Sequence, residues 1–391
     1  MRRIILLATI SLCSCVVTAQ SGRQAADSAE PQNLQPCSLN RASFPLQLEM
    51  RVPFAQTSFP SSGHSYLVYE LYLTNFGFSP VSLNRIALFN ADAATAQPVA
   101  AFGPQKLETM LQPIGGPPSD LKEKLVIASG RSAIVFMWVK FDRGETIPNS
   151  LVHCVETSGG AEEGAAITTH QTQPRVLGPP LEGGDWLADD GPSNDEDNHH
   201  RRGVFVLNGS ALDDRRFAID WMQVKKGATY SGDARDVRSY YSYGEPVLAV
   251  ADARVVAARD GLPDNIPGHG DAFHPAVPIT LDTIAGNTIT LDLGGGQYAY
   301  YMHLQPGSVR VHAGDRVRRG QAIARVGTTG DAREPHLHFE VTNSPELALG
   351  EGVPYLIGHY RTKTANGTTE LHTRELPLDH EVVDFIEAHA E

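Results

Sequence analysis

The chain has 391 residues, of which 41% are hydrophobic and 20% are charged, a composition typical of a folded protein with two or three domains. Its 32 basic and 45 acidic residues give a formal net charge of −13, and this acidic balance argues against a nucleic-acid partner. Outside the first 19 residues no apolar run approaches the roughly 20 residues of a membrane-spanning helix, so the sequence predicts no transmembrane span.

The first residues predict a secretory signal peptide over 1–19. Two arginines precede the apolar stretch at 4–17, and the small residues Val17-Thr18-Ala19 form a cleavage site before Gln20. We therefore expect an exported protein, either periplasmic or secreted. Because Leu12-Cys13-Ser14-Cys15 loosely resembles a lipid-attachment box, a lipoprotein is the alternative.

The cysteine count agrees with export. Cys13 and Cys15 lie within the signal, so cleavage after Ala19 leaves Cys37 and Cys154. An even pair of cysteines in an oxidising compartment predicts one disulfide, which would tie the start of the N-terminal region to its last strand. The alternative is two independent buried thiols.

The N-terminal region is expected to hold an all-β domain over residues 38–156, after a flexible leader at 20–37. Apolar alternation between turn residues predicts strands at 46–52, 66–74, 81–89 and 132–139. Short strands at this spacing indicate an immunoglobulin-like β-sandwich. Its sequence has no cluster of histidine, cysteine or acidic residues, so we expect it to position the rest of the protein or to bind a protein partner.

The remainder divides by composition into three segments. Residues 157–198 are acidic and rich in glycine and proline, which predicts an interdomain linker. A second domain is expected at 199–360 and a C-terminal extension at 361–391. No strong helical period interrupts the second domain, so its sheet should be mostly antiparallel. Its predicted strands lie at 203–207, 215–222, 246–258, 288–293, 297–304, 321–326 and 335–342.

Three of these strands carry residues suited to metal binding or proton transfer. In His336-Leu337-His338 the two imidazoles are two residues apart, and a strand turns both to the same face. His303 ends another predicted strand. Asp220 lies inside an apolar strand, where a carboxylate is unfavourable unless it is paired or coordinated. The pattern indicates a metal site, although exposed histidine pairs are common.

The second domain resembles the M23 family of zinc metallopeptidases, the lysostaphin and LytM type that cuts peptide bridges in peptidoglycan. The resemblance covers roughly residues 200–345 and implies a lysostaphin-type antiparallel β-sheet domain. It depends on four motifs: Gly314-Asp315-Arg316-Val317, Gly320-Gln321, Val326-Gly327-Thr328-Thr329-Gly330 and Pro335-His336-Leu337-His338-Phe339-Glu340.

This resemblance implies one Zn²⁺ per chain and a role for four residues. Asp220 and His338 match two of the zinc ligands. His303 and His336 match the catalytic pair, which would deprotonate the attacking water and stabilise the oxyanion. Peptidoglycan peptides would be the substrate.

One position departs from the family pattern. Four residues before Asp220 the family has a histidine ligand, but this sequence has Arg216. A guanidinium stays protonated and has no lone pair for a metal ion. Either another residue supplies the third ligand, or the site is inactive.

A replacement ligand is expected from the segment Asn198-His199-His200. If residues 203–207 pair with 215–222 around a loop near Ala211, His200 reaches the face of the sheet that carries Asp220, and a one-residue slip favours His199 instead. The alternatives are His269 or His274, in the Gly- and Pro-rich insertion 261–278, and the absence of a third protein ligand.

The sequence therefore predicts an exported zinc endopeptidase that hydrolyses peptide cross-links of peptidoglycan. Because Arg216 replaces a ligand, the alternative is a catalytically degenerate M23-like module that binds the cell wall or regulates a partner hydrolase. A zinc peptidase acting on another protein is a third hypothesis. The first and third hypotheses predict one tightly bound zinc ion, whereas the second predicts none.

Overall fold

The computed structural model describes residues 37, 45–93, 97–115, 124–170, 173–363 and 368–386. The predicted signal peptide at 1–19 and nearly all of the predicted leader lie outside the described residues. The expected all-β fold is confirmed, because strands dominate the described chain and its α-helix α1 (Pro104–Met110) is short. Among the described residues, no helix is both long enough and apolar enough to cross a membrane.

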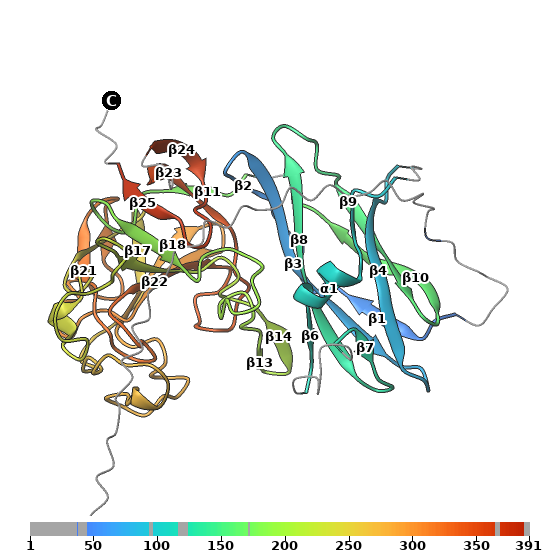
Figure 1. Cartoon of the computed structure of the whole chain (residues 1–391). Coiled ribbons are helices and arrows are strands. Elements are labelled where there is room, and N and C mark those ends of the chain that lie inside the picture. The colour runs from blue at the N-terminus through green and yellow to red at the C-terminus, as the bar shows by residue number, and fades with distance from the viewer. Residues whose placement is uncertain are drawn as a thin grey trace, which may run out of the picture. The chain divides into compact units, whose positions relative to one another are not determined.

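The N-terminal part consists of two five-stranded antiparallel sheets (Figure 1). Its strands are β1 (Leu48–Arg51), β2 (Phe59–Ser61), β3 (His64–Asn75), β4 (Val81–Asn90), β5 (Ala100–Phe102), β6 (Leu111–Pro113), β7 (Val126–Ile127), β8 (Ser132–Asp142), β9 (Ser150–Thr157) and β10 (Gly160–Thr168). One sheet has the order β1-β3-β8-β6, with β2 paired to β3. The other has the order β10-β9-β4-β5, with β7 paired to β4. We call this part the sandwich.

Alternating apolar side chains from both sheets fill the core of the sandwich. Leu71 of β3, Ile86 of β4 and Val155 of β9 belong to one buried cluster. A disulfide joins Cys37 to Cys154 of β9, with their Cα atoms 5.6 Å apart. The bond attaches the chain ahead of β1 to the second sheet.

The C-terminal part is built on an eleven-stranded sheet with the order β11-β23-β25-β12-β15-β22-β19-β18-β17-β20, in which β24 pairs with β23. All its pairs are antiparallel, as expected, except β11 with β23. Its strands are β11 (Arg175–Leu177), β12 (Trp186–Asp189), β15 (Ile219–Gln223), β17 (Ala253–Arg259), β18 (Thr288–Gly294), β19 (Gln297–Met302), β20 (Arg316–Val317), β22 (Leu337–Thr342), β23 (Tyr355–Lys363), β24 (Thr369–Glu375) and β25 (Val382–Phe385).

Two two-stranded antiparallel sheets and two 3₁₀ turns complete this part. β13 (Phe205–Leu207) pairs with β14 (Ser210–Leu212), and β16 (Pro246–Leu248) pairs with β21 (Ala322–Arg325). The 3₁₀ turns are η1 (Val237–Ser239) and η2 (Gly270–Ala272).

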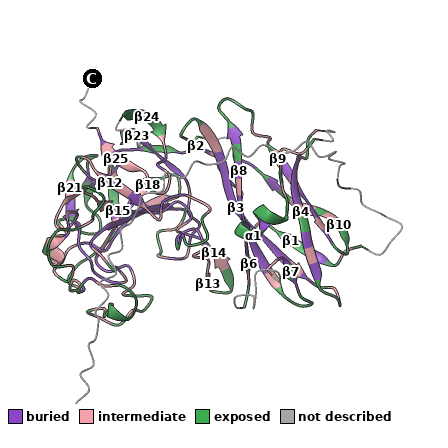
Figure 2. Cartoon of the chain, viewed as in Figure 1, coloured by how far each residue is buried: buried purple, intermediate pink, exposed green. Residues whose placement is uncertain are grey.

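Strand β3 is buried along most of its length and packs against both the sandwich core and the C-terminal part (Figure 2). Successive side chains of a strand point to opposite faces. Leu67 and Leu71 therefore face the sandwich core, whereas Tyr66 and Val68 face the other way and join the hydrophobic cluster of the C-terminal part. The two parts share buried surface and are not joined by a flexible connection alone.

The expectation of a linker at 157–198 is wrong. The segment contains β10, which completes a sandwich sheet, and β11 and β12, which belong to the eleven-stranded sheet. The expected C-terminal extension at 361–391 is also wrong in part, because β24 and β25 lie in that same sheet. The composition was misleading for two reasons. β11 and β12 are short and are flanked by turns rich in glycine, proline and acids. β10 carries Gly160, Glu162, Glu163 and Gly164 within the strand itself.

The expected pairing of residues 203–207 with 215–222 is wrong as well. Asn208 and Gly209 both have positive φ values, 50° and 80°, which makes a two-residue hairpin turn favourable. β13 therefore pairs with β14 across that turn. Strand β15 instead pairs with β12 on one side and with β22 on the other.

Candidate metal centre and active site

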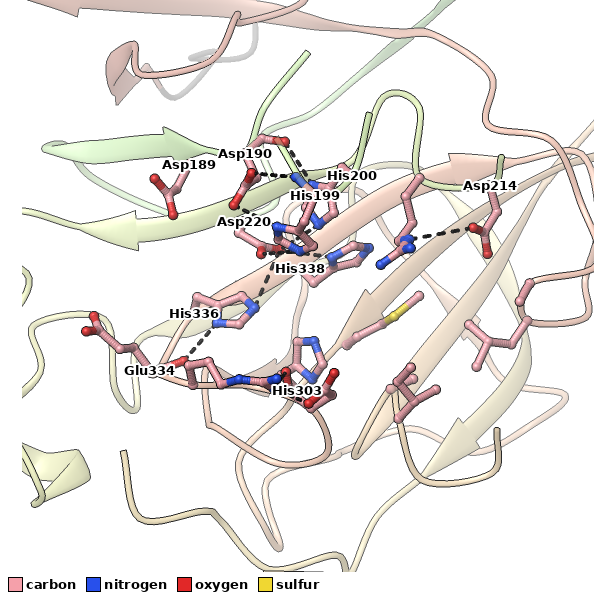
Figure 3. A pocket seen from close by; sticks show the side chains of 18 of the residues that line it. Asp189, Asp190, His199, His200, Asp214, Asp220, His303, Glu334, His336 and His338 are labelled. Atoms are coloured by element: carbon pink, nitrogen blue, oxygen red, sulfur yellow. Dashed lines mark hydrogen bonds and ion pairs between the residues drawn. The ribbon is translucent and has the colours of Figure 1, made fainter. Parts of the chain in front are cut away.

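Two neighbouring strands bring the predicted ligands Asp220 and His338 together (Figure 3). They are direct partners in the register of β15 and β22. His338 Nδ1 is 2.9 Å from Asp220 Oδ1, and His336 Nε2 is 3.4 Å from the same oxygen. The alternation of the strand places His336 and His338 on one face, as their spacing predicted. His303 follows β19, the next strand of the sheet, and its ring centroid is 4.8 Å from that of His336.

These side chains line a pocket of about 440 Å³. Its wall combines residues from strands β12, β13, β15, β19 and β22 with residues from several loops. The polar and titratable lining residues are Asp189, Asp190, His199, His200, Asp214, Arg215, Asp220, His269, His303, Asp331, Arg333, Glu334, His336 and His338.

His199 and His200 both reach Asp220, although not through the expected hairpin. Strand β12 ends at Asp189, directly opposite Asp220, and the chain then turns back over residues 198–203, which we call the histidine turn. His200 Nε2 lies 3.5 Å from Asp220 Oδ1, and His199 Nε2 lies 3.8 Å from Asp220 Oδ2. Donor atoms of all three residues lie within 4.8 Å of one another, a spacing that could hold one metal ion.

The surroundings of His200 suit a metal ligand better than those of His199. His200 is buried, and its Nδ1 donates a hydrogen bond to the Asp190 carbonyl at 2.8 Å. The lone pair must then be on Nε2, which has no hydrogen-bond partner. Burial also lowers the pKa of His200 well below its ordinary value, so the ring stays neutral. His199 is half-exposed, and its Nδ1 pairs with Asp190 at 2.8 Å.

Glu340 is a site residue that our sequence reasoning missed. Its Oε2 lies 3.1 Å from Nε2 of His338, and both side chains are buried. Both ring nitrogens of His338 donate, Nδ1 to Asp220 and Nε2 to Glu340. If a cation replaced the Nδ1 proton, the Nε2–H bond to Glu340 would keep the Nδ1 lone pair directed toward Asp220, which is the arrangement that orients a metal-binding imidazole. The signal was present in the sequence, because the same alternation that pairs His336 with His338 also places Glu340 on that face.

The charges of this cluster fit a divalent cation. Burial by itself would raise the pKa of Asp220, but His336, His200 and His338 hold that pKa well below its usual range, so the group is an anionic donor. Burial would lower the pKa of His338, but its hydrogen bonds to Asp220 and Glu340 raise it to about 10. Two imidazole nitrogens and one carboxylate oxygen are a donor set that zinc commonly takes in catalytic sites.

His303 and His336 are held in matching orientations. His303 Nδ1 donates to the Thr329 carbonyl and His336 Nδ1 donates to the Glu334 carbonyl, both at 2.8 Å. Each ring therefore carries its lone pair on Nε2. His303 also has a φ of 62°, a left-handed conformation that is uncommon for a non-glycine residue and is often found at functional sites. Burial, reinforced by His336, lowers the pKa of His303 well below its ordinary value.

Arg216 lies outside this metal-binding cluster. Its guanidinium binds the carboxylates of Glu70 and Glu351 and donates to the Gly352 carbonyl at 3.1 Å. Of the alternative ligands, His269 lines the pocket but pairs with Glu334 at 2.8 Å. His274 is not among the residues that line the pocket.

Residues 236–348 match the model of peptidase family M23. They form a peptidase M23 domain. The matched segment of this domain contains His303, His336 and His338, but it begins after the histidine turn and after Asp220. The M23 domain therefore contains His303 and His336, which are the predicted catalytic pair, and one candidate ligand, whereas the other candidate ligands precede it.

The chain is also similar to named proteins over part of its length. It is 30% identical over 139 residues to the peptidoglycan DD-endopeptidase ShyB of Vibrio cholerae, which covers 35% of this chain and 26% of that protein. It is 32% identical over 138 residues to the glycyl-glycine endopeptidase ALE-1 of Staphylococcus capitis, covering 32% of each. The chain thus spans about a quarter to a third of these relatives. A solved structure, the catalytic domain of lysostaphin from Staphylococcus simulans, is 22% identical and has a TM-score of 0.24 over 43% of this chain and 88% of that one.

Proposed function

We propose that the protein is an exported, zinc-dependent endopeptidase that hydrolyses peptide cross-links of peptidoglycan. The observation that carries this proposal is that His338 Nδ1 and His200 Nε2 lie 2.9 and 3.5 Å from the same oxygen of Asp220, beside two further imidazoles. The M23 domain and the similarity to a peptidoglycan DD-endopeptidase and a glycyl-glycine endopeptidase support the substrate class. The Cys37–Cys154 disulfide supports an oxidising compartment, and hence export.

Asp220, His338 and His200 would hold the zinc ion, and His199 is the alternative to His200. When bound, zinc lowers the pKa of a water toward neutrality and polarises a carbonyl oxygen. The orphaned Nε2 of His200 supports this assignment, because a buried acceptor without a partner is unfavourable unless another group satisfies it.

His303 and His336 would move the proton during hydrolysis. Both rings donate Nδ1–H to a backbone carbonyl, so each offers Nε2 to the reacting groups. One Nε2 accepts a proton from the attacking water and later returns it to the leaving amine. The other ring, when protonated, donates a hydrogen bond to the oxygen on which negative charge develops. The backbone carbonyls that accept from Nδ1 of both rings keep Nε2 as the atom that faces the reacting groups.

The proposal is tested by zinc content and by hydrolysis of purified sacculi with and without a chelator. We expect about one zinc per chain and an activity that the chelator abolishes. His338→Ala should lose zinc, whereas His336→Ala should keep zinc and lose turnover, because only the former removes a ligand. A zinc-free wild-type protein without hydrolysis would contradict the proposal and favour the degenerate module that Arg216 suggests. Cleavage of a protein but not of sacculi would identify a different substrate.

A further inference from the structure

A buried carboxylate of the sandwich faces the C-terminal part. Glu70 lies in the middle of β3, on the same strand face as Val68 and Tyr72, and is only 3% exposed. A buried carboxylate is strongly unfavourable without cationic partners. Glu70 has two such partners, Arg201 and Arg216, and both come from the C-terminal part.

Arg201 connects Glu70 to the histidine turn, because it directly follows His200. Its Nη1 binds Glu70, and its Nη2 donates to the Tyr69 carbonyl at 3.0 Å and to the Met137 carbonyl at 3.1 Å. The guanidinium also lies over the ring of Phe136, 4.8 Å from its centroid. The sandwich strands β3 and β8 therefore hold Arg201 of the histidine turn through an ion pair, two backbone carbonyls and an aromatic ring.

Arg216 connects the same carboxylate to the segment that carries Asp220. Its Nε lies 3.0 and 3.1 Å from the two oxygens of Glu70, and its Nη2 lies 2.6 Å from Glu351. Arg216 precedes Asp220 by four residues. Glu70 thus joins the two chain segments, one ending in His200 and the other in Asp220, that must meet to bind a shared ion.

We propose that Glu70 is a positioning residue for the metal centre: by binding Arg201 and Arg216 together, it holds the histidine turn where His200 and Asp220 can share one ion. The inference depends on the proposed metal-binding function. It assigns the sandwich a direct part in building the site. Consecutive Cα atoms are about 3.8 Å apart, so a shift of the Arg201 backbone is passed directly to His200.

A structural role alone makes a different prediction. A buried ion cluster that served only folding could be replaced by apolar residues of similar size with little loss of stability. If Glu70 positions the metal centre, the apolar replacement Glu70→Leu with Arg201→Met and Arg216→Met should restore folding but not metal affinity. The comparison of these two quantities separates the two roles.

The experiment measures Co²⁺ binding by its visible absorption spectrum, in parallel with thermal unfolding monitored by circular dichroism. Glu70→Gln and Arg201→Met should each weaken Co²⁺ binding by about tenfold or more and change the spectrum, because the ligands no longer converge. Glu156→Gln is the control for loss of a sandwich carboxylate. Glu156 Oε1 lies 2.6 Å from Arg85 Nη1, and this ion pair lies wholly within the sandwich, so its removal should leave Co²⁺ binding unchanged.

The outcomes are distinguishable. A wild-type protein that binds no Co²⁺ overturns the proposed function itself. A wild-type protein that binds Co²⁺, together with folded Arg201→Met and triple variants of unchanged affinity and spectrum, overturns only the role of Glu70. Arg201→Met decides the matter even if Glu70→Gln fails to fold, because Glu70 keeps Arg216 as its partner in that variant.

Discussion

Glu340 offers a sharp test of the metal centre, because it touches a candidate ligand without being a ligand itself. In Glu340→Gln the hydrogen bond from Nε2 of His338 can persist, but its acceptor loses its charge. A hydrogen bond to a charged group contributes about 1.5–3 kcal/mol, against about 1 kcal/mol for a neutral pair, so the expected loss is about 0.5–2 kcal/mol. That loss corresponds to a roughly 2- to 30-fold weaker zinc affinity.

The zinc dissociation constant of the two proteins, measured by competition with a chromophoric chelator, checks this prediction. Glu346→Gln removes the same charge from an exposed position and is the control. Because the pair of His338 and Glu340 is 3.1 Å apart and almost fully buried, solvent screening should not hide the effect. Equal zinc affinity in wild type and Glu340→Gln would refute the idea that Glu340 orients His338 for a metal ion.

Two further predictions concern the third ligand and acid stability. His200→Ala should lower the zinc content after dialysis more than His199→Ala, because only His200 offers a buried, unpartnered nitrogen; the reverse order would contradict the assignment. Burial lowers the pKa of His153 in the sandwich to about 4. The unfolded chain therefore binds a proton more readily than the folded one below about pH 6.5, and the free energy of unfolding falls by about 3 kcal/mol as the pH decreases toward 4. His153→Gln should therefore lose less unfolding free energy between pH 7 and 4 in urea titrations, and an unchanged pH dependence would count against it.

Local patterns were sufficient for the part of the site that local geometry determines. The two-residue period of a strand predicts that His336 and His338 share a face, and the isolated acid in an apolar strand predicts a partner for Asp220. The same two arguments apply to Glu340 and Glu70, where the sequence reasoning did not use them. Glu70 is an acid in the apolar strand β3, as Asp220 is in β15.

Contacts between residues far apart in the chain could not be predicted from local sequence patterns. His200 was expected beside Asp220 through a hairpin, and it reaches Asp220 through a turn that follows β12. The register of β15 depends on β12 and β22, and β22 begins more than 110 residues later in the chain. Likewise the partner of Arg216 is Glu70, 146 residues away in the sequence. No local period or composition can indicate such a partner, because it depends on how two separately patterned sheets pack.

The position of Arg216 explains why the proposed metal centre would need a ligand from outside the M23-matching segment. A histidine at that position would contribute a ligand close to Asp220, whereas Arg216 contributes a charge that Glu70 of the sandwich and Glu351 of the C-terminal part neutralise together. The candidate ligand then comes from the histidine turn, whose Arg201 binds the same sandwich carboxylate. Both consequences place Glu70 between the two segments. Arg216 in place of a histidine and the contact of the sandwich with the histidine turn therefore depend on the same carboxylate. We expect the proposed site to lose metal affinity when either is removed.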